Sequence, residues 1–169
     1  FCGAGLNDKL WTVAVDCCGL LIEWLAAEPL LGSQAKLIWA SDKCPIVKKY
    51  VLDKFKLQKW YDYAFRLDDG LPTPRCRIYF AGFPCQPFSS AGKGFGLDDP
   101  RGGVFDGCRD YIDSQRPDIF ILENVSGLGQ IDGGKVIDLF MSLLRFIGGG
   151  AYAVSKFLLN SEDFGVPHH

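Results

Sequence analysis

Short apolar runs alternate with longer mixed segments along most of the chain. Three runs have the length and composition of strands: KLIWAS at 36–41, RIYFAGF at 77–83 and DIFILENV at 118–125. DIFILENV is so rich in large apolar residues that we expect a buried strand. AYAVSKFLLNS, at 151–161, predicts a further strand near the end of the chain.

The longer segments between these runs have the pattern and the boundary residues of helices. Glu28-Pro29 is expected to end the first helix, Pro45 falls in the first turn of the second, and Gly148–Gly150 follows the last. Residues 60–76 are mixed and contain turn signals. The predicted helices span about 8–27, 45–55, 104–115 and 134–147.

The alternation of helices with strands predicts an α/β fold with a mostly parallel sheet and helices on both faces. In such sheets, ligands bind at the carboxyl ends of the strands. The glycine turn FCGAG at 1–5, Asp42, PCQ at 84–86 and ENV at 123–125 are predicted to gather along that edge.

The composition excludes several classes of protein. The 169 residues suit one domain with a sizeable core, and 48% apolar with 22% charged residues is ordinary for a globular protein. A net charge of −2 gives no overall basic field for nucleic acid, although a basic cleft is still compatible with it. Seven cysteines without a CxxC motif indicate a reducing, intracellular setting. The two histidines are the last two residues, which disfavours a metal site, and no apolar stretch is long enough for a membrane span.

Two segments suggest a nucleotide-like ligand. The glycines of FCGAG would let a ligand approach the backbone closely, although a plain turn before a helix has the same composition. Asp42, after the strand 36–41, stands where such folds bind a ribose diol, or it caps the helix that follows.

Cys85 and Glu123 are the candidates for chemistry. Cys85 lies between Pro84 and Pro87 at the start of a long glycine-rich loop, where it is either a presented thiolate or an inert loop cysteine. Glu123 ends an apolar strand, and burial without a partner would be costly and would raise its pKa. A salt bridge to Arg101 or Lys93 is the structural alternative, and Arg101 itself could anchor the loop or a phosphate.

Taken together, these segments resemble the cytosine-C5 DNA methyltransferases. The resemblance is carried by FCGAG, by GFPCQPFSSAGKGFGLDDPRGGVF, by DIFILENVSGL and, near the end, by NSEDFGVP, in the family's order. It implies a Rossmann-like fold that transfers a methyl group from S-adenosylmethionine to carbon 5 of cytosine in DNA. The implied partner is DNA, with no metal and no membrane, in a chain that we expect to be monomeric and, in a eukaryote, nuclear.

The resemblance also implies roles for individual residues. Cys85 would attack cytosine C6, Glu123 would hold the base, and the base would leave the duplex to reach them. The implied catalytic residues are Pro84, Cys85, Gln86, Glu123 and Asn124. The implied cofactor-binding residues are Phe1, Gly3, Ala4, Gly5, Asp42, Lys43, Asp62, Gly82 and Val104. The implied substrate contacts are Ser89, Arg101 and Val125.

The chain also departs from the family's pattern. The family has a strand and an acidic residue before FCGAG, an aspartate where Arg77 stands, and an arginine-containing motif where His168 and His169 stand. We therefore expect residues 1–169 to be a partial catalytic domain, truncated at both ends and without the target-recognition region. That domain could be inactive as it stands.

Two other functions compete with this one. A related family that methylates tRNA shares PCQ and ENV, although PFSSAGK at 87–93 favours the DNA enzymes. A catalytically silent, methyltransferase-like binding module would explain the missing arginine, but it would not need Cys85 and Glu123.

Overall fold

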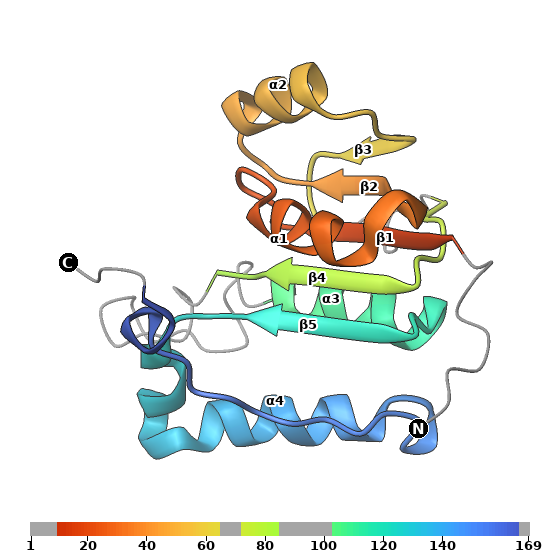
Figure 1. Cartoon of the computed structure of the whole chain (residues 1–169). Coiled ribbons are helices and arrows are strands. Elements are labelled where there is room, and N and C mark those ends of the chain that lie inside the picture. Colours follow the sequence, from red (N-terminus) through yellow and green to blue (C-terminus); the bar gives the residue numbers. More distant parts are fainter. Residues whose placement is uncertain (1–9, 65–71, 85–102, 166–169) are drawn as a thin grey trace, which may run out of the picture. The chain divides into compact units, whose positions relative to one another are not determined.

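The computed structural model describes residues 10–64, 72–84 and 103–165, and these form a parallel sheet of five strands in the order β3-β2-β1-β4-β5 (Figure 1). The strands are β1 (Trp11–Asp16), β2 (Ala35–Ser41), β3 (Lys59–Tyr61), β4 (Ile78–Gly82) and β5 (Ile119–Glu123). The α-helices are α1 (Ile22–Leu31), α2 (Pro45–Lys54), α3 (Gly103–Gln115) and α4 (Lys135–Phe146). Short 3-10 segments are η1 (Gly32–Gln34), η4 (Ser126–Gly134), η5 (Ile147–Gly149) and η6 (Ser161–Phe164).

The predicted α/β class is confirmed, because every strand pair in the sheet is parallel and helices cover both of its faces. On one face, Trp24 of α1 and Val51 of α2 share a buried cluster with Val13 and Val15 of β1. Burying such side chains is the main stabilising term for the sheet.

Helix α3 covers the opposite face through an aromatic cluster. The ring of Tyr111 lies 5.0 Å from that of Trp39 on β2 and 4.7 Å from that of Tyr79 on β4. Trp39 and Tyr111 both donate hydrogen bonds to the carbonyl of Pro74, at 3.0 and 2.8 Å. This cluster fixes the chain just before β4 and therefore fixes where β4 ends.

The predicted helix over 8–27 is wrong in its first half. Residues 11–16, WTVAVD, are the central strand β1, and the helix begins only at Ile22. Val13 to Asp16 are fully buried between β2 and β4, so both faces of the strand are covered and no polar alternation marks it. Pro29 does not end the helix, which continues to Leu31 and is closed by Gly32 donating to the carbonyl of Glu28.

Three further expectations differ from the structure. The segment 151–160 is in no strand, and Phe157 and Leu158 are exposed. Strand β5 is not buried, because β4 is its only partner among the described residues, and Ile121 is 49% exposed. The three-residue strand β3 overlaps the start of segment 60–76, which had no clear pattern in the sequence. Its pairing with β2 makes it a strand, and its own residue pattern does not.

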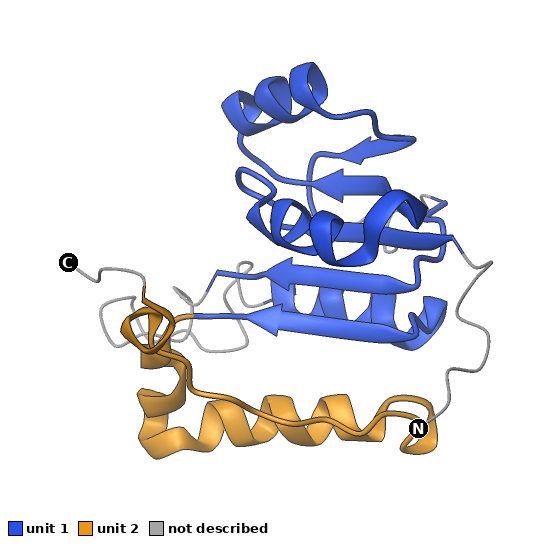
Figure 2. Cartoon of the chain, in the orientation of Figure 1, with its two compact units in different colours: residues 1–124 blue, residues 125–169 orange. Residues whose placement is uncertain are grey.

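The chain divides into two compact units, residues 1–124 and 125–169 (Figure 2). The first contains the whole sheet with α1, α2 and α3. In the second, η4 packs against α4, and Leu128, Phe140 and Leu144 are buried.

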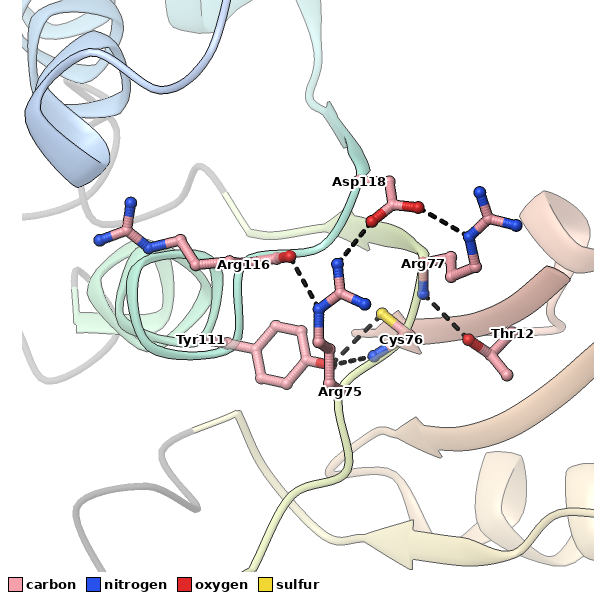
Figure 3. Close-up of polar contacts among 7 residues, drawn as sticks. All are labelled: Thr12, Arg75, Cys76, Arg77, Tyr111, Arg116 and Asp118. Atoms are coloured by element: carbon pink, nitrogen blue, oxygen red, sulfur yellow. Dashed lines mark hydrogen bonds and ion pairs between the residues drawn. The ribbon is translucent and has the colours of Figure 1, made fainter. Parts of the chain in front are cut away.

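Asp118 links the amino ends of β4 and β5 through two arginines (Figure 3). Its carboxylate accepts from Arg75 at 2.5 Å and from Arg77 at 2.7 Å. The guanidinium of Arg77 also stacks 3.8 Å from the centroid of the Trp11 ring, and its backbone N–H donates to the Thr12 hydroxyl at 3.0 Å. Arg77, the residue that departs from the family's aspartate, thus connects β1, β4 and β5.

These contacts predict a pH dependence of stability. The hydrogen bond from Arg77 and then that from Arg75 hold the pKa of Asp118 below its ordinary value, although partial desolvation opposes them. The stabilisation is therefore present above about pH 4, the unfolded pKa, and is lost as the pH falls through the lower folded pKa. We expect Asp118→Asn to lower the free energy of unfolding by roughly 0.5–1 kcal/mol at pH 7.

Urea unfolding of the wild type and of Asp118→Asn between pH 7 and pH 3 checks this. The difference between the two should shrink below about pH 4. Asp53→Asn, at an exposed position on α2, is the control and should show no such convergence. A difference for Asp118→Asn that stays constant with pH would rule out the ion pairs as its source.

Candidate functional site

The carboxyl ends of all five strands lie at one edge of the sheet because the strands are parallel. The turn after β1, Asp42 after β2 and Asp62 after β3 lie there, together with Pro84 after β4 and Asn124 after β5. The sequence predicted that FCGAG, Asp42, PCQ and ENV gather at this edge. The structure shows this for Asp42, for Pro84 of PCQ, and for Glu123 and Asn124 of ENV.

The turn from β1 into α1 has an unusual backbone. Cys17, Gly19 and Leu21 have φ angles of 52°, 46° and 60°, in the left-handed region that residues other than glycine seldom adopt. The turn is held by Cys18 N–H donating to the carbonyl of Ser41 at 2.9 Å and by Leu21 N–H donating to that of Cys18 at 2.7 Å. Such strained backbone persists only where the surrounding contacts determine it, and it is frequent at ligand sites.

Asp16, the last residue of β1, is fully buried beneath this turn. Its carboxyl oxygens accept hydrogen bonds from the Ser41 hydroxyl on β2 and, at 2.5 Å, from the Tyr79 hydroxyl on β4. A buried carboxyl group is tolerated only when it has such partners. Asp16 therefore ties three neighbouring strands together just below the site.

We expect Tyr79→Phe to destabilise the chain, because it removes a hydrogen-bond donor from a buried carboxyl group. The expected loss is about 1–3 kcal/mol in the free energy of unfolding, measured by urea denaturation. Tyr50→Phe is the matched control, since Tyr50 lies on α2, is 37% exposed and should change stability little. An equal effect of both substitutions would show that the Asp16 contact contributes nothing.

Asp42 is the predicted ribose ligand, and the structure gives it two backbone partners. One oxygen accepts from Gly19 N–H at 3.0 Å and the other from Cys44 N–H at 2.8 Å. Asp42 thus connects the β1–α1 turn to the start of α2. Carboxylate oxygens have further lone pairs, so this bonding leaves room for a hydroxyl donor.

Asp62 and Lys43, two other predicted cofactor residues, are both exposed. Asp62 accepts from Lys48 at 2.7 Å and from the Trp60 indole at 2.9 Å, and the bond from Lys48 in particular lowers the pKa of Asp62. These two bonds therefore hold the Asp62 carboxylate just after the end of β3.

Strands β4 and β5 bring the predicted catalytic segments together. Gly82 pairs with Glu123 in the parallel register, and the Asn124 side chain donates to the carbonyl of Phe83 at 2.6 Å. Phe83 is two residues before Cys85 in the sequence. The ENV segment therefore holds the chain that leads into PCQ.

Gly82 lies between two carboxylates. A Cβ at this position would stand 3.5 Å from an oxygen of Glu123 and 3.6 Å from an oxygen of Glu23 on α1. The expectation that Glu123 is buried is wrong, because β5 is an edge strand of the described sheet and Glu123 is exposed.

Glu23 and Cys18 also belong to this region, and the sequence analysis did not single them out. Cys18 is buried, and burial followed by the charges of Asp42 and Glu23 raises the pKa of its thiol, so it is not a nucleophile. The apolar run WTVAV is followed by the acidic residue Asp16 and then by Cys-Cys-Gly. This pattern could have identified the turn.

Of the other predicted residues, two are described and eight are not. Val104 is half-buried at the start of α3, and Val125 is 58% exposed in the second unit. The following lie outside the described residues: Phe1, Gly3, Ala4, Gly5, Cys85, Gln86, Ser89 and Arg101.

Two other kinds of site, a metal centre and a membrane span, are absent from the described ranges. Within them, no three His, Cys, Asp or Glu side chains are grouped so as to hold a metal ion. No helix in the same ranges combines the length and the apolar character needed to cross a bilayer.

Comparison with known proteins identifies the family of the chain. A family model described as C-5 cytosine-specific DNA methylase matches residues 29–169, which is most of the chain. The chain belongs to this family. Its parallel sheet, and the contacts of Glu123 and Asn124 with the residues that precede PCQ, are consistent with membership of the C-5 cytosine-specific DNA methylases.

Several curated members of the family are similar to the chain. Type II methyltransferase M.NgoBI of Neisseria gonorrhoeae is 42% identical over 99 residues, covering 59% of this chain and 30% of that protein. M.NlaIV of Neisseria lactamica is 32% identical over 141 residues, covering 79% of this chain and 32% of that protein. The chain thus spans about a third or less of the length of these relatives.

A solved structure supports the fold. The crystal structure of the Spodoptera frugiperda DNMT2 E260A/E261A/K263A mutant matches with a TM-score of 0.53 at 18% identity. The match covers 79% of this chain and 40% of that one. At this identity the likeness shows a shared Rossmann-like methyltransferase fold.

Proposed function

We propose that the chain is a part of a DNA cytosine-5 methyltransferase that contains its catalytic cysteine and a cofactor turn. The observation that carries the proposal is the contact of Asn124 with the Phe83 carbonyl, at 2.6 Å, beside the Gly82–Glu123 pairing. This supports the proposal because Glu123 pairs with Gly82, three residues before Cys85 in the sequence, and Cys85 and Glu123 are the two groups that the proposed reaction needs.

The described residues fit S-adenosylmethionine as the cofactor. The β1–α1 turn is held open by backbone bonds, and Gly82 leaves the space that a side chain would fill. Asp42 offers carboxylate lone pairs for a ribose, and Glu23 has a buried oxygen without a hydrogen-bond partner among the described residues. These features make the β1–α1 turn a further candidate for the cofactor turn, and the FCGAG residues Phe1, Gly3, Ala4 and Gly5 remain proposed cofactor contacts. S-adenosylmethionine, when bound, supplies an activated methyl group to C5.

Cys85 is proposed as the nucleophile because cytosine C5 is a poor nucleophile by itself. Addition of the thiolate to C6 forms an S–C6 bond and moves the electron pair of the C5=C6 bond toward C5. After methylation, loss of the C5 proton to a base restores the double bond and expels the thiolate of Cys85. The cytosine must leave the duplex for this, as bases do in other enzymes that modify them.

Glu123 is proposed to hold the base during this addition. Its carboxyl group can bind N3 and the 4-amino group of cytosine, where charge changes as the thiolate adds. Asn124 is proposed to position the approach to Cys85 through Phe83, and Pro84 and Gln86 to shape it. Ser89, Arg101 and Val125 remain proposed substrate contacts, and Lys43, Asp62 and Val104 remain proposed cofactor contacts.

Covalent trapping tests the proposal. The chain is incubated with S-adenosylmethionine and DNA that contains 5-fluorocytosine, and intact mass is measured. Fluorine at C5 cannot leave as a proton does, so the S–C6 bond should persist as an adduct. Glu123→Gln should slow adduct formation roughly 100-fold or more, because it removes the proton-carrying group.

The controls separate the competing functions. Cys85→Ser should abolish the adduct, whereas Cys44→Ser, which changes a half-buried cysteine just before α2, should not. An adduct with 5-fluorocytosine tRNA but not with DNA would favour the tRNA enzymes. An adduct that forms only with a longer version of the protein would show that the 169 residues are too short for the reaction. No adduct with either version and either nucleic acid would favour a silent binding module.

A further inference from the structure

Positive charge is concentrated in one short segment of the chain. Residues 43–59 contain six lysines and a single acidic residue, Asp53, so they carry a net charge of +5 in a chain whose net charge is −2. The segment contains helix α2 and the first residue of strand β3. Four of its lysines are exposed and are not among the proposed cofactor contacts or their partners: Lys49, Lys54, Lys56 and Lys59. We call these four residues the α2–β3 lysine surface.

The charges of this surface are not balanced within the described part of the chain. Lys48 forms an ion pair with Asp62 at 2.7 Å, but none of the four lysines has a described ion-pair partner. The arginines at the other edge of the sheet differ in this respect, because Arg75 and Arg77 share the carboxylate of Asp118. The lysine surface is therefore a group of like charges without acidic partners among the described residues.

The stability of α2 does not explain these lysines. The helix is held by buried Val51 and by apolar neighbours that pack on the same core cluster. Cations favour a helix only near its carboxyl end, where Lys54 lies, and Lys49 is in the other half of α2, whose first turn has no acidic residue. A surface that serves only solubility normally mixes charges of both signs.

We propose that the α2–β3 lysine surface binds the phosphate backbone of duplex DNA. Exposed lysines are flexible point charges that contact phosphates and release the counterions bound to them. The edge of the sheet that contains the candidate site cannot supply such contacts, because Glu23, Asp42 and Glu123 make it acidic. The choice of DNA among polyanions rests on the proposed function.

The surface lies within reach of a duplex held at the candidate site. Helix α2 begins three residues after Asp42, and Figure 1 shows α2 and β3 at the end of the sheet opposite β5. Three strand spacings separate β3 from β4, which is about 14 Å. Phosphates follow one another about every 3.4 Å along a DNA strand, so this distance corresponds to roughly four base pairs.

The salt dependence of DNA binding tests the inference. Two labelled duplexes of equal length and unrelated sequence are titrated with the 169-residue chain between about 50 and 200 mM salt, and Kd is measured by fluorescence anisotropy. Replacing all four lysines by glutamine should weaken both duplexes equally, by about 10-fold or more at the lowest salt, because backbone contacts do not depend on sequence. The slope of log K against log salt should become shallower by about 3 to 4, since each lost contact removes about 0.9.

Two variants serve as controls. Replacing the four lysines by arginine keeps the charge and should keep the slope. A second variant makes the same change in net charge at exposed positions elsewhere and should bind as the wild type does: Lys36→Gln, Lys135→Gln, Arg145→Gln and Lys156→Gln. If the fourfold glutamine variant does not fold in urea titrations, Lys49→Gln and Lys56→Gln decide singly, each with an expected loss of about 0.9 in slope.

The outcomes separate this inference from the proposed function. An unchanged slope in the glutamine variant, an equal loss in the charge-matched control, or a wild type that binds neither duplex overturns the inference. Lysine-dependent binding of phosphatidylserine vesicles without binding of the duplexes overturns the assignment to DNA. The proposed function is decided independently by the covalent adduct of Cys85: a missing adduct with a lysine-dependent slope overturns the function and leaves the surface in place.

Discussion

Asp16 is the contact on which the geometry of the site depends. It is the last residue of the central strand, it is fully buried, and it accepts hydrogen bonds from Ser41 on β2 and Tyr79 on β4. Because these bonds are buried, where the local dielectric is low, they fix where three strands end relative to one another. The turn that follows, Asp42 on one side and Gly82 on the other, takes its position from that alignment.

The chemistry at this edge follows from its charge. Asp42, Glu23 and Glu123 lie near the carboxyl ends of β1, β2, β4 and β5, and none of them has a described lysine or arginine as an ion-pair partner. The basic cluster of Arg75 and Arg77 lies at the opposite ends of β4 and β5, where it stabilises the sheet through Asp118. An acidic edge suits a cofactor that carries positive charge. It does not suit the phosphates of DNA, so under the proposed function the contacts to the nucleic acid backbone would come from other residues.

The sequence predicted the fold class and several elements correctly, and its errors have a common cause. Helices α2, α3 and α4 were found because capping residues and periodicity are local signals. The strand β1 was missed because WTVAVD is buried on both faces and reads as part of an apolar helix. Strand β3 and the exposure of β5 depend on which strands pair with them, and pairing is not encoded within a window of a few residues.

What the sequence determined by itself is the family. The segments FCGAG, PCQ, ENV and NSEDFGVP indicated it, and Cys85, Glu123 and Asp42 were proposed as site residues because reactive side chains after strand ends are a local pattern. Only the tertiary structure decided that the turn at 17–21 follows the central strand and that Glu23 faces Gly82 and Glu123. Glu23 is 100 residues from Glu123 in the chain. The two meet because parallel pairing brings the ends of β4 and β5 beside the helix that follows β1, and no local pattern contains that information.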